Sequence, residues 1–291
     1  FPRDADKARE NFEADQWSQE MECQFLGGEN EYFGSELLQD STHPQTAYPG
    51  AVLWLGIDTA SVVDTTAIQC VWAQKDALWL GDTYILQHTQ YETDMHRKRV
   101  GQVTIADVVM RHLGATGCVI DVTGDMARRV SGIASLYTLL SPMHSQMAVL
   151  PQNITQSWKD KNVQEVKVGL QTGRIRIAGG RKDYIYSKRH VSQFIADGPR
   201  VPDSMVAPFM RVAFSESKFP VLIQDFRKVY RKWTSATATT FDVKRDGQGH
   251  GDSFWAAVLG YSVAKKAKLG GGGGKPREQA RPAAPVYAGY I

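Results

Sequence analysis

Three aspartates stand where a carboxylate can be held on a rigid element. Asp58 ends the apolar run 53–57, Asp121 ends the apolar run 118–120, and Asp252 opens a helix predicted over 253–268. Burying a lone carboxylate is costly, so each must be solvated, paired or bound to a metal ion. Ligands of α/β sheets collect outside the carboxyl ends of the strands. If strands 51–58 and 117–122 are neighbours, Asp58 and Asp121 reach one cation, and Asp252 completes the site.

Three carboxylates in one place predict a site for hard divalent cations. Oxygen ligands select Mg²⁺ or Mn²⁺, and a pair of such ions about 3.5–4 Å apart supports in-line cleavage of a phosphodiester by water. We therefore interpret Asp58, Asp121 and Asp252 as catalytic residues and metal ligands. Asp125 and His250 are candidate accessory ligands, and the glycines that flank His250 would let the backbone approach the ions or the scissile phosphate.

Each of these residues also has an ordinary structural interpretation. Asp58 can cap a turn, and Asp252 suits the first turn of a helix because of the helix dipole. Asp125 can be the N-cap of a helix over 126–140, and Asp64 can hydrogen-bond its own turn. For Asp64 and Asp125 we prefer the structural interpretation. His250 is explained equally well as a solvated turn residue.

The elements that must position these residues indicate an α/β protein with a mixed central sheet flanked by helices. Strands are predicted at 51–58, 65–73 and 78–88, as an antiparallel meander. Helix 94–113, strand 117–122, helix 126–140, strand 147–150 and helix 158–171 then alternate at lengths that suit a parallel layer. The later predicted elements are a strand at 173–178, an amphipathic helix at 221–233, a strand at 237–243 and the helix at 253–268.

The chain divides into three parts by composition. Residues 1–48 are predicted to be an N-terminal helix followed by a polar, turn-rich linker. Residues 49–268 hold the acids and the predicted sheet. Residues 269–291 are rich in glycine and proline and need not fold.

Three basic segments, at 95–99, 181–190 and 227–232, are candidates for contacts with DNA phosphates. Each alone is typical of a solvated face, but three of them in a chain with an acidic site favour a nucleic-acid substrate. The candidate DNA-binding residues are Arg97, Lys98, Arg99, Arg181, Lys182, Lys188, Arg189, Arg227, Lys228, Arg231 and Lys232.

Composition excludes several classes of protein. Hydrophobic residues make up 42% and charged residues 22% of the 291 residues, as in ordinary globular proteins. The net charge of +3 is too small to identify a nucleic-acid partner by itself. Cys23, Cys70 and Cys118 are far apart, which disfavours a disulfide scaffold and structural zinc. No run is apolar enough for a membrane span or a signal peptide, so we expect a soluble intracellular protein without a membrane partner.

The order of the motifs resembles a known family. GIDTA followed by DTTAI, then CVIDVTGD, then GHGDSFWAAVLGY is similar to the RNase H-like nuclease domain of the large terminase subunit of tailed bacteriophages, especially its Mu-like branch. The resemblance covers about residues 50–265. It implies an RNase H-like α/β fold and places the metal ligands of the family on Asp58, Asp121 and Asp252, with His250 and Asp125 as accessories.

The resemblance also implies a biological setting. It suggests a Mg²⁺- or Mn²⁺-dependent endonuclease that cuts double-stranded concatemeric viral DNA during genome packaging, in the host cytoplasm, with the portal protein and the small terminase subunit as partners. The segment around Phe12, Trp17 and residues 20–25 resembles the end of the terminase ATPase domain. The sequence contains no GxxxxGK[ST] phosphate loop, so we do not expect the ATP motor in this chain.

Two other functions remain open from the sequence. An actin-like or sugar-kinase-like ATPase also begins with a strand, an aspartate and a hairpin, but it needs a second glycine-rich phosphate hairpin that 121–124 supplies only in part. A non-catalytic module that docks on DNA or on the portal would use the same acids as structural residues. Junction resolvases and transposases share the acids but not the ATPase-like segment that precedes them.

Overall fold

The structure is a computed structural model that describes residues 31–44, 48–60, 65–123, 135–196, 198–235, 238–244 and 251–269. The helix predicted near the N-terminus and the glycine-rich segment after residue 269 lie outside the described residues. Among the residues that are described, no helix is long and apolar enough to cross a membrane.

The sheet begins with the predicted antiparallel meander, which the structure confirms. It consists of β2 (Val52–Asp58), β3 (Thr65–Ala73) and β4 (Leu78–Gln87). Asp58 pairs with Ala67, and Thr65 pairs with Gln87. The carboxyl ends of β2 and β4 therefore lie at the same edge of the sheet.

Parallel strands extend the meander on both sides. β5 (Gly117–Asp121) pairs with β2, and β6 (Ala148–Gln152) pairs with β5. On the other side, β7 (Ile175–Ala178) and β8 (Asp183–Tyr186) both pair parallel with β4. The two-residue β1 (Thr42–His43) pairs with β7, and β9 (Phe214–Glu216) pairs with β8. The order β4-β3-β2-β5-β6, with only β3 antiparallel to the others, is that of an RNase H-like fold, which confirms the predicted fold class.

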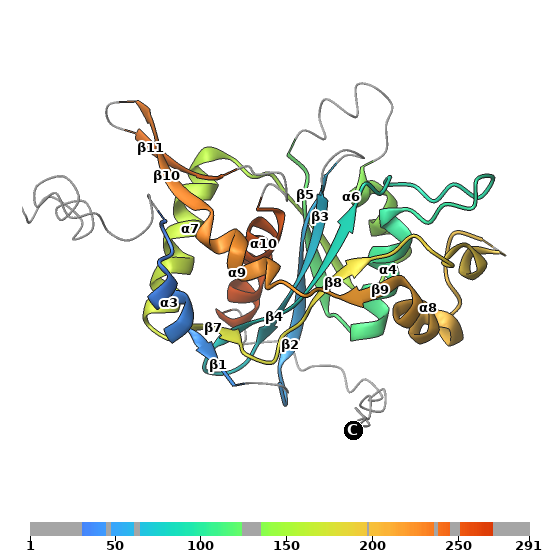
Figure 1. Ribbon diagram of the computed structural model, residues 1–291, viewed down its shortest axis with the longest axis horizontal. Helices are drawn as coiled ribbons and strands as arrows, with labels where there is room; N and C mark the ends of the chain where they lie inside the picture. Colours follow the sequence, from blue (N-terminus) through green and yellow to red (C-terminus); the bar gives the residue numbers. More distant parts are fainter. Residues whose placement is uncertain are drawn as a thin grey trace, which may run out of the picture.

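Helices cover both faces of this sheet (Figure 1). One face carries α4 (Gln102–Leu113), α6 (Leu136–Leu140) and α8 (Val206–Ala213). The other carries α3 (Ser35–Asp40), α7 (Gln156–Gln171), α9 (Val221–Arg227) and α10 (Asp252–Leu269). Short 3₁₀ turns lie at Ser141–Met143, Ser192–Ile195 and Asp203–Met205. Each face has its own apolar core, with Ile105 and Val109 on the α4 side and Phe254 and Val258 on the α10 side.

Two predicted helices are shorter than expected. The helix predicted at 94–113 begins only at Gln102, because Asp94 and Arg99 pair their backbones with each other in two hydrogen bonds of 2.9 Å. The helix predicted at 221–233 ends at Arg227. From Val229 to Ser235 the chain forms β10, which pairs antiparallel with β11 (Ala238–Val243). Residues 229–235 are rich in β-branched and aromatic side chains, which favour a strand.

The described part of the expected linker packs on the sheet. Phe33 is fully buried between Phe226 and Phe254, with ring centroids 5.1 Å and 5.6 Å away. Strand β1 then joins the sheet through Thr42, which pairs with Ile177. Residues 31–43 therefore belong to the same packed unit as the segment that begins at residue 49.

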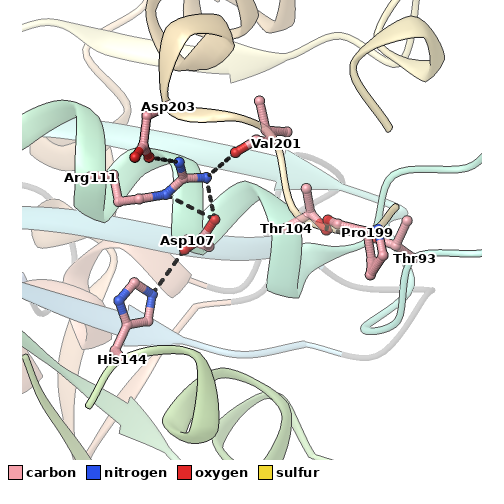
Figure 2. A network of polar contacts seen from close by, with 8 residues as sticks. All are labelled: Thr93, Thr104, Asp107, Arg111, His144, Pro199, Val201 and Asp203. Atoms are coloured by element: carbon pink, nitrogen blue, oxygen red, sulfur yellow. Dashed lines mark hydrogen bonds and ion pairs between the residues drawn. The ribbon is translucent and has the colours of Figure 1, made fainter. Parts of the chain in front are cut away.

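A buried polar network fixes the α4 face (Figure 2). Asp107 on α4 is fully buried, and Arg111 and His144 approach its carboxylate to 2.5 Å and 3.1 Å. Arg111 also donates to Asp203 at 2.7 Å and to the carbonyl of Val201 at 2.8 Å. Burial raises the pKa of Asp107, but the hydrogen bonds from His144 and Arg111 outweigh it, so the pKa is lowered. The network ties α4 to two loops and holds the carboxylate ionised.

Helix α10 lies unusually close to β2. A Cβ added at Gly56 would lie 1.8 Å from the carbonyl oxygen of Ala256 and 2.5 Å from the backbone nitrogen of Gly260. A side chain at either glycine would push the helix away from the strand. The two glycines thus allow the backbones to touch, and this contact sets where the first residue of α10 lies relative to the end of β2.

We expect Gly56→Ala to lower the free energy of unfolding by about 1–3 kcal/mol, because α10 must move to make room for the methyl group. Gly34→Ala is the matched control, since an added Cβ there meets nothing within 4 Å. Its cost should stay below about 1 kcal/mol. Urea denaturation of both variants measures the difference. Equal stability of the two variants would contradict a backbone contact at Gly56.

Candidate active site

Two of the three predicted acids occupy neighbouring strand ends. Asp58 is the last residue of β2 and Asp121 is the last residue of β5. The strands are parallel, and Ile57 pairs with Ile120 directly before the two acids. Both carboxylates therefore leave the sheet side by side at its carboxyl edge.

The third acid comes to the same place from α10. Asp252 is the first residue of this helix, which packs on β2 and β3 at the glycine contact described above. Burial raises the pKa of Asp58 well above its ordinary value, and the negative charges of Asp252 and then Asp121 raise it further. The pKa shift shows that the three carboxylates act on one another electrostatically.

The donor set fits a hard divalent cation by its chemistry. Three carboxylates supply only oxygen ligands, and their mutual repulsion would be relieved by a bound cation. Within the ranges that the structure describes, however, no three His, Cys, Asp or Glu side chains lie close enough together to hold a metal ion. The acids are gathered at one edge without forming a finished coordination sphere.

Backbone and hydroxyl groups orient Asp121. The amide of Thr123 donates to its Oδ1 at 2.7 Å, as in an Asx turn. Thr59 Oγ1 donates to the carbonyl of Asp121 at 3.1 Å and links the end of β2 to the end of β5. These bonds limit the directions in which the carboxylate can point.

Asp225 on α9 is a further acid of this site that the sequence did not reveal. Its buried carboxylate accepts hydrogen bonds from the Ser253 hydroxyl at 2.5 Å and the Ser253 amide at 3.2 Å. Lys228 approaches it to 3.4 Å. Burial raises the pKa of Asp225, while the bonds from Ser253 and the charge of Lys228 lower it. Asp225 thus caps the first turn of α10 beside Asp252 and also adds negative charge near Asp58.

Lys159 on α7 is the second residue that sequence reasoning missed. Its positive charge lowers the pKa of Asp58, against the effect of the acids. Its ammonium group lies 4.5 Å from the ring centroid of Trp255 on α10. The sequence could not identify Lys159 as part of the site, because α7 carries several charged residues. Only the packing of α7 on α10 shows which of them lies near the acids.

The remaining acidic-site candidates, Asp125 and His250, lie outside the described residues, as does Asp64.

The candidate DNA-binding residues fall into distinct groups. Lys98 and Arg99 lie in the loop between β4 and α4, close to Lys188 after β8. The guanidinium of Arg181 forms a nearly buried pair with Asp183 at 2.5 Å, and Lys182 pairs with Glu216 at 2.7 Å. Arg97 approaches Asp94 to 3.7 Å, Arg231 lies over the rings of Tyr32 and Phe241, and Lys232 is 3.9 Å from Asp242. The other described candidates are Arg189, Arg227 and Lys228.

We expect Asp225→Ala to lower the free energy of unfolding by about 1–3 kcal/mol, because the buried Ser253 groups lose their acceptor. The start of α10 should also shift, so any rise in melting temperature caused by Mn²⁺ should shrink. Asp242→Ala is the control, because it removes a half-exposed pair with Lys232 that contributes about 0–1 kcal/mol and a local hydrogen bond from the Val243 amide, and neither touches α10. A destabilised Asp225→Ala protein with an unchanged Mn²⁺ effect would limit Asp225 to a structural role.

Comparison with solved structures finds large terminases of several bacteriophages. The large terminase nuclease of the thermophilic phage G20c is 11% identical over 80% of this chain and 98% of that chain, with a TM-score of 0.48. Its structure with bound magnesium is 12% identical over 81% of this chain and 98% of that chain, with the same TM-score. The HK97 bacteriophage large terminase is 10% identical over 78% of this chain, with a TM-score of 0.47, and this chain covers 42% of its length.

No protein-family model and no curated protein matches the chain. The solved structures named above are all described as large terminases or their nucleases, the family that the order of motifs in this sequence resembles.

Proposed function

We propose that this protein is a divalent-cation-dependent endonuclease that cuts double-stranded DNA. One observation carries the proposal: the parallel pairing of β2 with β5 and the backbone contact of α10 with β2 bring Asp58, Asp121 and Asp252 to one edge of the sheet, where Asp252 and Asp121 repel the charge of Asp58. A protein gains nothing from such repulsion unless a cation offsets it. Capping alone would not require three acids at one place, so the arrangement favours catalysis over the docking function.

In this proposal Asp58, Asp121 and Asp252 hold Mg²⁺ or Mn²⁺ at the edge of the sheet. Two such ions would activate water and stabilise the leaving oxygen of a phosphodiester. The Thr123 amide holds the Asp121 carboxylate in its direction, and Asp225 keeps Asp252 in place through Ser253. Lys159 limits the net negative charge that a DNA phosphate meets as it approaches.

The substrate and the setting follow from the sequence. The basic segments supply contacts with DNA phosphates, and no element reads as a helix that presents base-reading side chains to a major groove, so cutting should show little sequence preference. The resemblance of the motif order to large terminases suggests that the cut serves the packaging of a viral genome. It makes the portal protein and the small terminase subunit the partners to test.

We expect Asp58→Asn, Asp121→Asn and Asp252→Asn each to abolish cleavage of plasmid DNA in Mg²⁺ or Mn²⁺. Each substitution removes a ligand and relieves repulsion, so the free energy of unfolding should be unchanged or slightly raised. Plasmid-cleavage assays and thermal melts with and without Mn²⁺ measure both effects. Excess EDTA should stop cleavage by the wild type.

The matched control is Asp76→Asn in the exposed turn between β3 and β4, at the opposite edge of the sheet. It should retain cleavage and the Mn²⁺ effect on melting. If the three site variants instead unfold more easily and still cut, the acids are structural. Cleavage that persists in EDTA would exclude the metal-dependent mechanism.

The raised pKa of Asp58 makes a prediction about pH. Without divalent ions, the folded state keeps a proton on this carboxyl that the unfolded chain releases above the ordinary value of 3.8. The stability that this proton contributes is present below about pH 4 and is lost as pH rises through the raised pKa. Asp58→Asn lacks this loss, so its stability advantage over the wild type should grow with pH. Melts between pH 4 and pH 8 test this, and a difference that is constant over that range would contradict it.

A further inference from the structure

A basic pocket lies at the same edge of the sheet as the carboxylates. It encloses about 370 Å³ between the loop after β4 and the segment after β8, and its lining includes His88, Lys98, Arg99, Tyr186 and Lys188. These residues come from two segments about ninety positions apart in the sequence. The pocket is therefore a product of the fold and not of one basic run.

The charge of this pocket is of one sign. Lys98, Arg99 and Lys188 are cationic at neutral pH, and no carboxylate is found among the described residues that line it. Three exposed cations around one cavity give it a positive potential that attracts anions. The charge of this lining favours an anionic ligand.

The backbone around this pocket is strained. Among the described residues, the non-glycine residues with positive φ are His88 at 48°, Lys98 at 51° and His190 at 60°. The first two line the pocket, and the third lies two residues after Lys188. Such conformations are unfavourable for residues with a side chain, and they collect at binding sites. The ammonium group of Lys188 donates to the carbonyl of His88 and so joins the two strained segments.

The register places this pocket beside the acids. Gln87 ends β4 and pairs with Thr65 on β3. Since β3 pairs in turn with β2, the end of β4 lies two strands away from Asp58 at the end of β2. Strand β8 runs parallel to β4 and ends at the same edge, one strand further out. With about 4.8 Å between strands, the ends of β4 and β8, from which the pocket is built, lie about 10–15 Å across the sheet from the end of β2. Figure 1 shows the loop after β4 extending from this edge of the sheet.

We propose that the pocket lined by Lys98, Arg99 and Lys188 binds a backbone phosphate of the DNA a few nucleotides from the bond that is cut. One DNA strand advances about 3.4 Å per nucleotide, so a strand whose scissile phosphate lies at the carboxylates reaches the pocket after about three or four nucleotides. The pocket then fixes the direction of the duplex across the sheet edge. This inference rests on the proposed endonuclease function.

The test compares two double variants with equal loss of charge. Lys98→Gln with Lys188→Gln removes two of the three cations of the pocket, and glutamine at position 188 can still donate to the His88 carbonyl. Lys75→Gln with Arg174→Gln removes two exposed cations at the opposite edge of the sheet. Fluorescence anisotropy with a labelled 30-base-pair duplex, in EDTA and at several salt concentrations, measures binding without cleavage.

The pocket variant should bind the duplex about three- to tenfold more weakly, and the dependence of log affinity on log salt should become shallower by about 0.9, the value for one phosphate. The control variant should bind like the wild type. Equal losses in both variants, or no loss in either, would overturn the proposal. If circular dichroism shows that the pocket variant is unfolded, Arg99→Gln alone replaces it.

A second arm separates DNA from free phosphates. Inorganic phosphate or ATP at millimolar concentration should leave the melting temperature of the wild type unchanged. A rise that the pocket variant lacks would assign the pocket to a small ligand and overturn the DNA proposal. If the wild type cuts no DNA but the pocket variant still binds the duplex more weakly than the wild type, the endonuclease function is refuted and the pocket proposal stands. If the wild type cuts DNA and the pocket variant binds the duplex as well as the wild type does, the pocket proposal is refuted and the endonuclease function stands.

Discussion

The contact between the backbones of α10 and β2 is the constraint on which the candidate site depends. Gly56 and Gly260 leave no room for a side chain, so the helix rests directly on the strand. Asp252 at the start of that helix is then held beside Asp58 at the end of the strand. A larger separation would still bury the apolar faces of both elements, but it would draw the third carboxylate away from the other two.

Repulsion between like charges is built into one edge of the sheet in two places. Asp58, Asp121 and Asp252 gather negative charge at the ends of β2 and β5 and the start of α10, and Asp225 adds to it. Farther along the same edge, Lys98, Arg99 and Lys188 gather positive charge after β4 and β8. Folding brings these groups together at an electrostatic cost, and cations at the first place and a phosphate at the second would offset it.

The interior uses charge in the opposite way. Asp107 is fully buried, yet its carboxylate is matched by Arg111 and His144, and its pKa is lowered. That network joins α4 to the segments at 141–144 and 201–203. Asp225 stands between the two cases, since its carboxylate accepts hydrogen bonds from Ser253, is approached by Lys228, and also adds negative charge near Asp58. The contrast separates a buried acid whose charge is offset by its neighbours from acids whose charges act on one another.

The sequence by itself determined the meander and the alternation of strands and helices after it, because apolar runs leave a local trace. It also predicted that Asp58 and Asp121 end strands and that Asp252 opens a helix, as the structure shows. It did not determine that residues 229–235 form a strand, since pairing with 238–243 is a long-range choice that overrides the amphipathic pattern. Asp225 and Lys159 left no signal, because each became part of the site only through packing against α10. Lys98 and Lys188 line one pocket because β8 pairs parallel with β4. No local sequence pattern connects these two segments.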